Sequence, residues 1–218
     1  MGKLRTGDGR RSCDMGPLVT REHRDKVASY IDIAEKDGAT VVVDGRNPKV
    51  DRPINAVYAH GGGTMSENNA IRNNNIYNYL NPSTSSYGIN IRLGNSGLNI
   101  SGNSFYETTN FITTTTSVQY CIYISSSNGN GFTIAGNFIG GSEPLCAGTP
   151  WTKSGSNNMY YNIWLSTAGV TANSIQGNTI QNISWTNSGN GSLYGIYISG
   201  SSVVNLGTLK GNTIGAAT

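Results

Sequence analysis

The chain has 218 residues and a net charge of +3, and only 12% of its residues are charged. No apolar run reaches the eighteen or so residues that a membrane span requires, and so small a charge argues against a nucleic-acid partner. The composition changes near residue 51. Nineteen charged residues lie in the first 51 positions, and eight lie in the remaining 167, which hold 26 asparagines and no aspartate. We expect two regions, residues 1–51 and 67–218, separated by a glycine-rich junction at residues 52–66.

The first region predicts one helix followed by one strand. Apolar residues Val27, Tyr30, Ile31 and Ala34 recur at intervals of three and four, which is typical of an amphipathic helix. Thr20 is the expected N-cap and Gly38 the expected end of this helix, and residues 39–45 then predict a short buried strand. One helix and one strand bury too little surface to fold alone, so this region is expected to be an incomplete α/β fragment.

Residues 4–51 also resemble a known family. The segments Asp14-Met-Gly-Pro-Leu-Val19, His23-Arg-Asp-Lys-Val27 and Gly38-Ala-Thr-Val-Val-Val-Asp-Gly-Arg46 are similar to the aldehyde dehydrogenase superfamily, and within it to the CoA-acylating methylmalonate-semialdehyde dehydrogenases. The resemblance implies NAD-dependent chemistry. In that family the nucleophilic cysteine and most of the cofactor-binding portion lie outside the matching segment, and Cys13 occupies a position without a family role. We therefore expect no catalytic, cofactor-binding or metal-binding residues here, no cofactor, and a chain that is not an enzyme.

The junction ends in Gly61-Gly-Gly-Thr64, a flexible sequence that more often joins elements than binds a ligand. No carboxylate close in sequence could orient His60, so we expect it to be a solvated loop residue.

Two interleaved motifs repeat through residues 67–218. The first has an asparagine between aliphatic or aromatic residues, as in Ile134-Ala-Gly-Asn-Phe-Ile139, and the second is a Tyr-x-Ile-x-Ile pattern, as in Tyr120-Cys-Ile-Tyr-Ile124. The motif asparagines are Asn74, Asn103, Asn137, Asn178 and Asn212; the motif tyrosines are Tyr87, Tyr120, Tyr161 and Tyr194. The spacing from each tyrosine motif to the next asparagine motif stays nearly constant from repeat to repeat. Each repeat therefore predicts a structural unit that stacks on its neighbours, with an asparagine ladder and a column of stacked tyrosines.

The expected fold is mainly β, a short right-handed parallel β-helix preceded by the small α/β fragment. Tyr-x-Ile-x-Ile alternates with period two, and Gly-Asn marks a sharp bend, so each repeat reads as short strands joined by bends. The pattern resembles the right-handed parallel β-helix repeats of secreted and cell-surface bacterial proteins, and the repeats look incomplete at both ends. A leucine-rich repeat or a propeller would need a different period or more strands in each repeat.

Function is less constrained than fold. Polysaccharide-cleaving enzymes need paired carboxylates or several acidic calcium ligands, whereas the repeats hold only Glu67, Glu107 and Glu143, in unrelated phases. We therefore expect a structural or adhesin-like surface protein without catalysis of its own, fused to a dehydrogenase fragment in a chimeric or mis-assembled reading frame. One alternative is a methylmalonate-semialdehyde dehydrogenase, and another is a carbohydrate-active β-helix protein.

Partners and location follow from the same features. We expect glycans or cell-surface components as partners, no nucleic acid, no membrane span, and self-association through open strand edges. The repeats suggest an extracellular location and the first region a cytoplasmic one, and no signal peptide is recognisable. The sequence leaves open whether Cys121 and Cys146 form a disulfide.

Overall fold

The computed structural model describes residues 21–39, 55–61, 65–187 and 189–215. The chain divides into two compact units, residues 1–51 and 52–218. Of the first region, Cys13, Thr20 and the strand expected at residues 39–45 lie outside the described residues, apart from Ala39.

The first unit contains helix α1 (Arg21–Lys36). The helix ends at Gly38, which has a φ of +90°, while the Ala39 amide donates a hydrogen bond to the Ala34 carbonyl. A left-handed glycine with this bond is a common helix C-terminus, so Gly38 ends the helix as the sequence predicts. On the apolar face, Val27 and Tyr30 remain 39% and 56% exposed.

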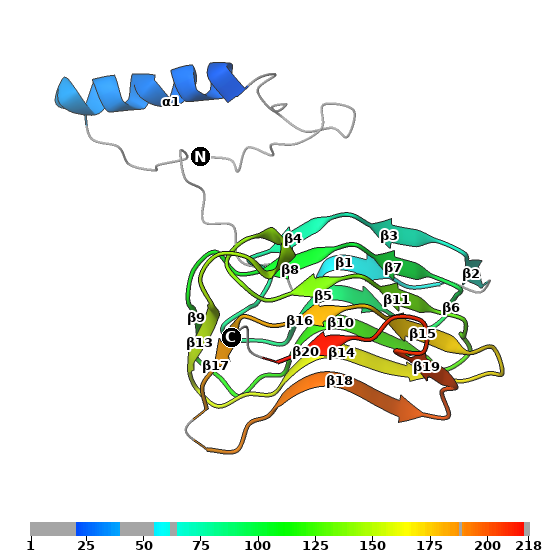
Figure 1. Ribbon diagram of the computed structural model, residues 1–218. Coiled ribbons are helices and arrows are strands. Elements are labelled where there is room, and N and C mark those ends of the chain that lie inside the picture. Colours follow the sequence, from blue (N-terminus) through cyan, green and yellow to red (C-terminus); the bar gives the residue numbers. More distant parts are fainter. Residues whose placement is uncertain (1–20, 40–54, 62–64, 188, 216–218) are drawn as a thin grey trace. The chain divides into compact units, whose positions relative to one another are not determined.

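The second unit is built from parallel strands in five sheets (Figure 1). The first sheet contains β1 (Asn55–Ala59), β5 (Ser86–Ile91), β10 (Gln119–Ser126), β14 (Tyr160–Thr167) and β18 (Leu193–Gly200). The second contains β3 (Ala70–Arg72), β7 (Asn99–Ser101), β11 (Thr133–Ala135), β15 (Asn173–Gln176) and β19 (Val204–Leu206). The third contains β4 (Asn75–Tyr77), β8 (Ser104–Tyr106), β12 (Phe138–Ile139), β16 (Thr179–Ile180) and β20 (Thr213–Ile214). The smaller sheets are β9 (Phe111–Thr113), β13 (Trp151–Gly155) and β17 (Ile183–Trp185), and β2 (Ser66–Glu67) with β6 (Asn95–Ser96); a short 3₁₀ turn, η2, spans Pro144–Cys146.

Within each large sheet, neighbouring strands are parallel and come from consecutive repeats, and the first and last strands pair on one side only. Ile100, Ile134 and Ile175 therefore lie in one register on neighbouring strands, and all three are fully buried. Each sequence repeat is one coil. The prediction of a mainly β, parallel solenoid is confirmed.

The solenoid begins earlier than the sequence indicated. Strand β1 lies inside residues 52–66, which the sequence assigned to a junction, and it pairs with β5 so that Asn55 aligns with Tyr87 and Val57 with Ile89. The first coil carries Asn-Ala-Val-Tyr-Ala where later coils carry Tyr-x-Ile-x-Ile. Because its tyrosine position holds an asparagine, the motif does not reveal this coil.

Sharp bends close each coil next to the ladder asparagines. Gly102, Gly136 and Gly177 precede Asn103, Asn137 and Asn178 and have φ values of +66°, +60° and +58°. In the first coil the same place is taken by an asparagine, Asn73, at φ +56°. Glycine and asparagine tolerate this left-handed conformation better than other residues do, which explains the Gly-Asn or Asn-Asn pair at the bend.

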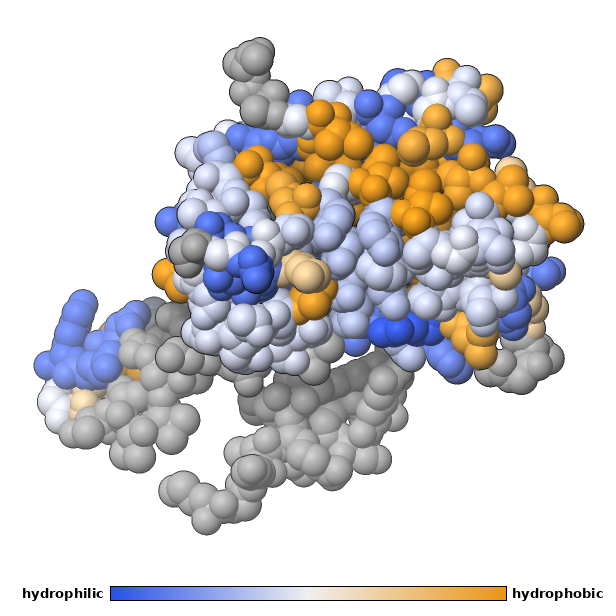
Figure 2. Space-filling view, turned by 90° about the horizontal axis from the view of Figure 1, so that it is seen from below, coloured by the Kyte–Doolittle hydropathy of each residue, from blue (hydrophilic) through white to orange (hydrophobic). Residues whose placement is uncertain are grey.

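The last coil leaves apolar side chains on the surface. Leu193, Ile198, Leu206 and Ile214 are between 38% and 54% exposed. Figure 2 views the molecule from below Figure 1, where β18 is the lowest strand, and shows a broad apolar patch on this side.

Candidate functional site

The outer face of the first sheet carries two aromatic rows, and in β10 the inward–outward alternation breaks between them. In β10 both Cys121 and Ile122 are fully buried, while Tyr120 and Tyr123 on either side are only partly covered. Strict alternation would have turned Tyr120 inward together with Ile122. The break instead places two outward positions in this coil.

The first aromatic row consists of Tyr87, Tyr120, Tyr161 and Tyr194. Their ring centroids lie 4.9, 5.3 and 4.5 Å apart in succession, with planes within 12° of parallel. The structure thus brings the four predicted tyrosines together, on the outside of the solenoid. Burial, reinforced by the neighbouring tyrosines, raises the pKa of Tyr120 to about 12.

The second aromatic row consists of Tyr123, Trp164 and Tyr197, which share one register. The Tyr123 and Trp164 rings lie 5.8 Å apart and the Trp164 and Tyr197 rings 4.3 Å apart, both stacked. In both rows most ring faces are therefore covered by other rings, which leaves mainly ring edges for a ligand.

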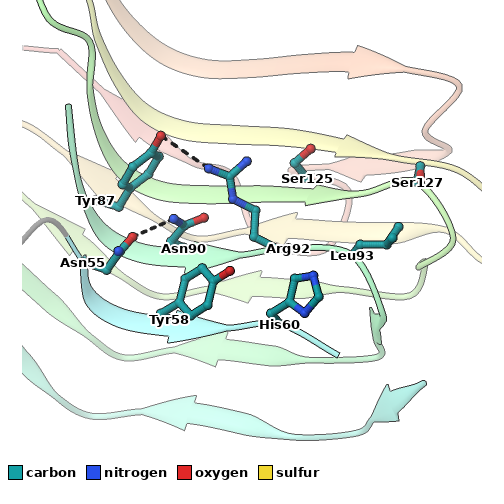
Figure 3. A pocket seen from close by; sticks show the side chains of 9 residues that line it. All are labelled: Asn55, Tyr58, His60, Tyr87, Asn90, Arg92, Leu93, Ser125 and Ser127. Carbon is teal, nitrogen blue, oxygen red and sulfur yellow. Dashed lines mark hydrogen bonds between the residues drawn. The ribbon is translucent and has the colours of Figure 1, made fainter. Parts of the chain in front are cut away.

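Both rows are interrupted at the first two coils. Asn55 holds the register position of the first row beside Tyr87, and Asn90 holds that of the second row between Tyr58 and Tyr123. The two amides pair, with Asn90 Nδ2 donating to Asn55 Oδ1 at 2.6 Å. An asparagine is smaller than the aromatic residue that other coils carry at the same position. The space beside Asn55 and Asn90 is therefore an open recess of about 660 Å³. The recess is lined by Asn55, Tyr58, His60, Tyr87, Asn90, Arg92, Leu93, Ser125 and Ser127 (Figure 3).

Arg92 is the charged group of this recess. Its two terminal nitrogens each donate to a tyrosine hydroxyl, that of Tyr123 and that of Tyr87, at 3.4 Å, and its guanidinium carbon lies 4.6 Å from the Tyr123 ring centroid. Tyr58 and His60 lie on the opposite side, with near-parallel rings 6.4 Å apart (Figure 3). None of the described lining residues is acidic.

Asn90 adds an unsatisfied acceptor. The side chain is only 2% exposed, and its Oδ1 has no hydrogen-bond partner within the described part of the chain. A buried carbonyl without a donor costs the fold free energy.

The five motif asparagines form a continuous column whose three middle members are fully buried, while Asn74 at one end is exposed. The Nδ2 atoms of Asn74, Asn103, Asn137 and Asn178 each donate to the Oδ1 of the next member, at 2.9 to 3.0 Å. Each of those oxygens also accepts the backbone amide of the preceding member. The structure places these residues in the coil bends, where their hydrogen bonds hold neighbouring coils together.

A second polar group in the interior surrounds Cys121. The hydroxyls of Tyr79 and Tyr160 lie 3.0 Å apart, all three side chains are fully buried, and desolvation raises all three pKa values well above their ordinary ranges. Cys121 and Cys146 are both free. Burial suppresses the thiolate form of Cys121, so it is an inert core residue.

Lys153 is the buried cation of the repeats. Its ammonium group donates to the carbonyls of Ser156 and Thr186, both at 2.8 Å, and to Asn187 Oδ1 at 2.5 Å, and desolvation lowers its pKa. Three oxygens therefore take the place of a carboxylate partner.

Across the described ranges there is no group of three or more metal-ligating side chains, and no helix there is long and apolar enough to cross a membrane.

Sequence reasoning missed the recess itself. It identified the tyrosine motif but assigned Tyr58 to a junction and His60 to a solvated loop, and it gave Arg92 no role. Aligning Asn55-Ala-Val-Tyr58 with Tyr87-Gly-Ile-Asn90 would have been the only available signal, and that alignment lacks the tyrosine and the isoleucine that define the motif.

Comparison with known proteins identifies relatives of the first region. A family model described as "Aldehyde dehydrogenase family" matches residues 1–59. "Malonate-semialdehyde dehydrogenase 1" of Bacillus licheniformis is 51% identical over 49 residues, 22% of this chain and 10% of that protein. The protein of the same name from Oceanobacillus iheyensis is 42% identical over 52 residues, and "Aldehyde dehydrogenase citD" of Monascus ruber is 43% identical over 51 residues, each covering 23% of this chain and 11% and 10% of the relative. No solved structure matches the chain significantly.

These matches confirm the resemblance of the first region and contradict the expectation that the chain is not an enzyme, because the similar proteins are named as dehydrogenases. The chain spans about a tenth of the length of those relatives. Their names specify malonate semialdehyde, so the likeness to methylmalonate-semialdehyde dehydrogenases is supported at the level of the wider family.

Proposed function

We propose that the solenoid is an adhesin-like surface that binds saccharides in the recess of its first two coils. The observation that carries this proposal is the interruption of both aromatic rows, at Asn55 and Asn90, which leaves an open recess beside the exposed Tyr58 ring and Arg92.

The chemistry of the recess suits a sugar. A sugar ring has an apolar face, which packs on an aromatic ring, and a rim of hydroxyls, which donate and accept hydrogen bonds. Tyr58 is 56% exposed and offers a ring, and Ser125 and Ser127 supply hydroxyls. An open recess on an extended solenoid surface would accept an internal stretch of a chain as well as its end.

The test is binding of the full chain to cellohexaose, mannohexaose and a glucuronate hexasaccharide by titration calorimetry. We expect at least one to bind, and Tyr58→Ala to weaken that binding about tenfold because it removes one ring contact. Tyr77→Ala is the matched control, since Tyr77 is a similarly exposed tyrosine that stacks on Tyr106 in the third sheet. The proposal fails if no hexasaccharide binds, or if both variants weaken binding equally.

A second candidate function rests on the relatives of the first region. Their names describe oxidation of malonate semialdehyde, and 51% identity over 49 residues supports an NAD-dependent semialdehyde dehydrogenase activity for the protein of which this region is part. The test is NAD reduction by the full chain with malonate semialdehyde and with methylmalonate semialdehyde, with and without CoA. Turnover above the buffer rate would support this candidate, and the preferred substrate would decide between the two names.

A further inference from the structure

We infer that the recess selects an anionic saccharide, one that carries a carboxylate or a sulfate, and that Arg92 is the residue that recognises the negative group. This inference rests on the proposed function and deepens it, because it concerns the charge of the ligand in the same recess.

Arg92 has hydrogen-bonding capacity left over. A guanidinium has five N–H donors, and here two of them reach tyrosine hydroxyls at 3.4 Å, the long end of the hydrogen-bonding range. No carboxylate pairs with Arg92 within the described residues, and Glu67, Glu107 and Glu143 do not line the recess. The positive charge is therefore available to a ligand.

The guanidinium is also held in place before a ligand arrives. Its carbon lies 4.6 Å from the centroid of the Tyr123 ring and 5.5 Å from that of the Tyr87 ring, and both hydroxyls contact its nitrogens. Two rings that fix a guanidinium reduce the rotational freedom it would lose on binding. A planar guanidinium fixed in this way suits the two oxygens of a carboxylate or of a sulfate.

The surroundings favour one charged contact within an otherwise neutral site. The remaining lining consists of amides, hydroxyls, two aromatic side chains, His60 and a leucine (Figure 3). Tyr58, across the recess from Arg92, would pack on the sugar ring, and the Ser125 and Ser127 side chains would bond its hydroxyls. The ligand class with an apolar ring face, hydroxyls and a negative group is an acidic or sulfated sugar.

The experiment compares saccharides that differ only in charge. The full chain is titrated with a glucuronate hexasaccharide and with its methyl ester, and with sulfated cellohexaose and cellohexaose, at low and moderate salt. We expect at least one charged form to bind tenfold or more tightly than its neutral match, with a preference that shrinks as salt increases. The pair that shows the preference identifies the negative group as carboxylate or sulfate.

Variants then assign the preference to one residue. Arg92→Gln should bring charged and neutral forms to the same affinity, and Arg92→Lys should retain part of the preference. Arg72→Gln is the control, because Arg72 is an exposed arginine on β3, in a different sheet. Equal binding of charged and neutral forms by the wild type, or equal losses in Arg92→Gln and Arg72→Gln, would overturn this inference and leave saccharide binding intact. Failure of every saccharide to bind would overturn the proposed function itself.

Discussion

The asparagine ladder and the two aromatic rows are both columns of stacked side chains, and they differ in where they lie and how they are satisfied. Asn103, Asn137 and Asn178 are fully buried and hydrogen-bonded to the coils on both sides. The aromatic rows lie on the outer face, are held by ring stacking, and are partly open to solvent.

The two columns also differ in continuity. The ladder runs through every coil, whereas each aromatic row has an asparagine at one position, Asn55 in the first row and Asn90 in the second. A gap in the ladder would leave buried donors and acceptors unpaired, whereas a gap in a surface row costs only ring contact and is filled by solvent or a ligand. This difference is why the interior column serves the fold and the interrupted outer column offers a site.

The largest expected effect comes from breaking the ladder. Asn137→Asp removes the Nδ2 donor that bonds both Ile100 O and Asn178 Oδ1, and should lower the free energy of unfolding by about 1–3 kcal/mol. Asn128→Asp is the control, because the Asn128 side chain is exposed and only its Oδ1 takes part in hydrogen bonds, as an acceptor. An aspartate can accept the same two hydrogen bonds. Urea unfolding of both variants measures the difference. Equal losses of unfolding free energy at the two positions would show that the ladder asparagine stabilises the fold no more than an exposed asparagine does.

Alkaline pH should destabilise the interior around Cys121. Burial raises the folded-state pKa of Cys121, Tyr79 and Tyr160, so these groups stabilise the fold fully below their unfolded pKa values, and that stability is lost as the pH rises above them. For Cys121 the loss begins near pH 9, at about 1.4 kcal/mol per pH unit. Cys121→Ala should flatten the slope of unfolding free energy against pH between about pH 9 and 10. An unchanged slope would show that the Cys121 thiol is not the titrating group.

Truncation within the second aromatic row should cost less than truncation within the ladder. Trp164→Ala removes ring contacts with Tyr123 and Tyr197 and should destabilise the solenoid by about 1 kcal/mol. Because Trp164 does not line the recess, saccharide affinity should stay unchanged. A loss of affinity equal to that of Tyr58→Ala would mean that binding spreads along the whole row.

The smallest expected effect is weak self-association through the apolar surface of the last coil. Leu206 and Ile214 are 49% and 54% exposed, and β18 pairs with a strand on one side only. Leu206→Glu with Ile214→Glu should reduce concentration-dependent association in sedimentation velocity. Leu209→Glu, at a 90% exposed leucine outside the strands, should leave it unchanged. A wild type that stays monomeric at every concentration would exclude this contact.

The repeat spacing was sufficient to predict the parallel solenoid, one coil per repeat, and the residues that stack. It was insufficient for the recess. Tyr58, Asn90 and Arg92 do not stand out as a motif, and they meet only because β1 pairs with β5 and the adjacent coil places Tyr123 beside them.

What the sequence by itself determined is the repeat: glycine or asparagine at the bends, aliphatic side chains in the core, and asparagines that can pair from coil to coil, all of which are local requirements visible in spacing. Only the tertiary structure decided that the tyrosines face outward, because the alternation breaks at Cys121 and Ile122, two residues that both fit the interior. It also decided where the rows stop. Register between coils aligns Asn55 with Tyr87, and that alignment depends on backbone pairing between residues more than thirty positions apart, which no local pattern records.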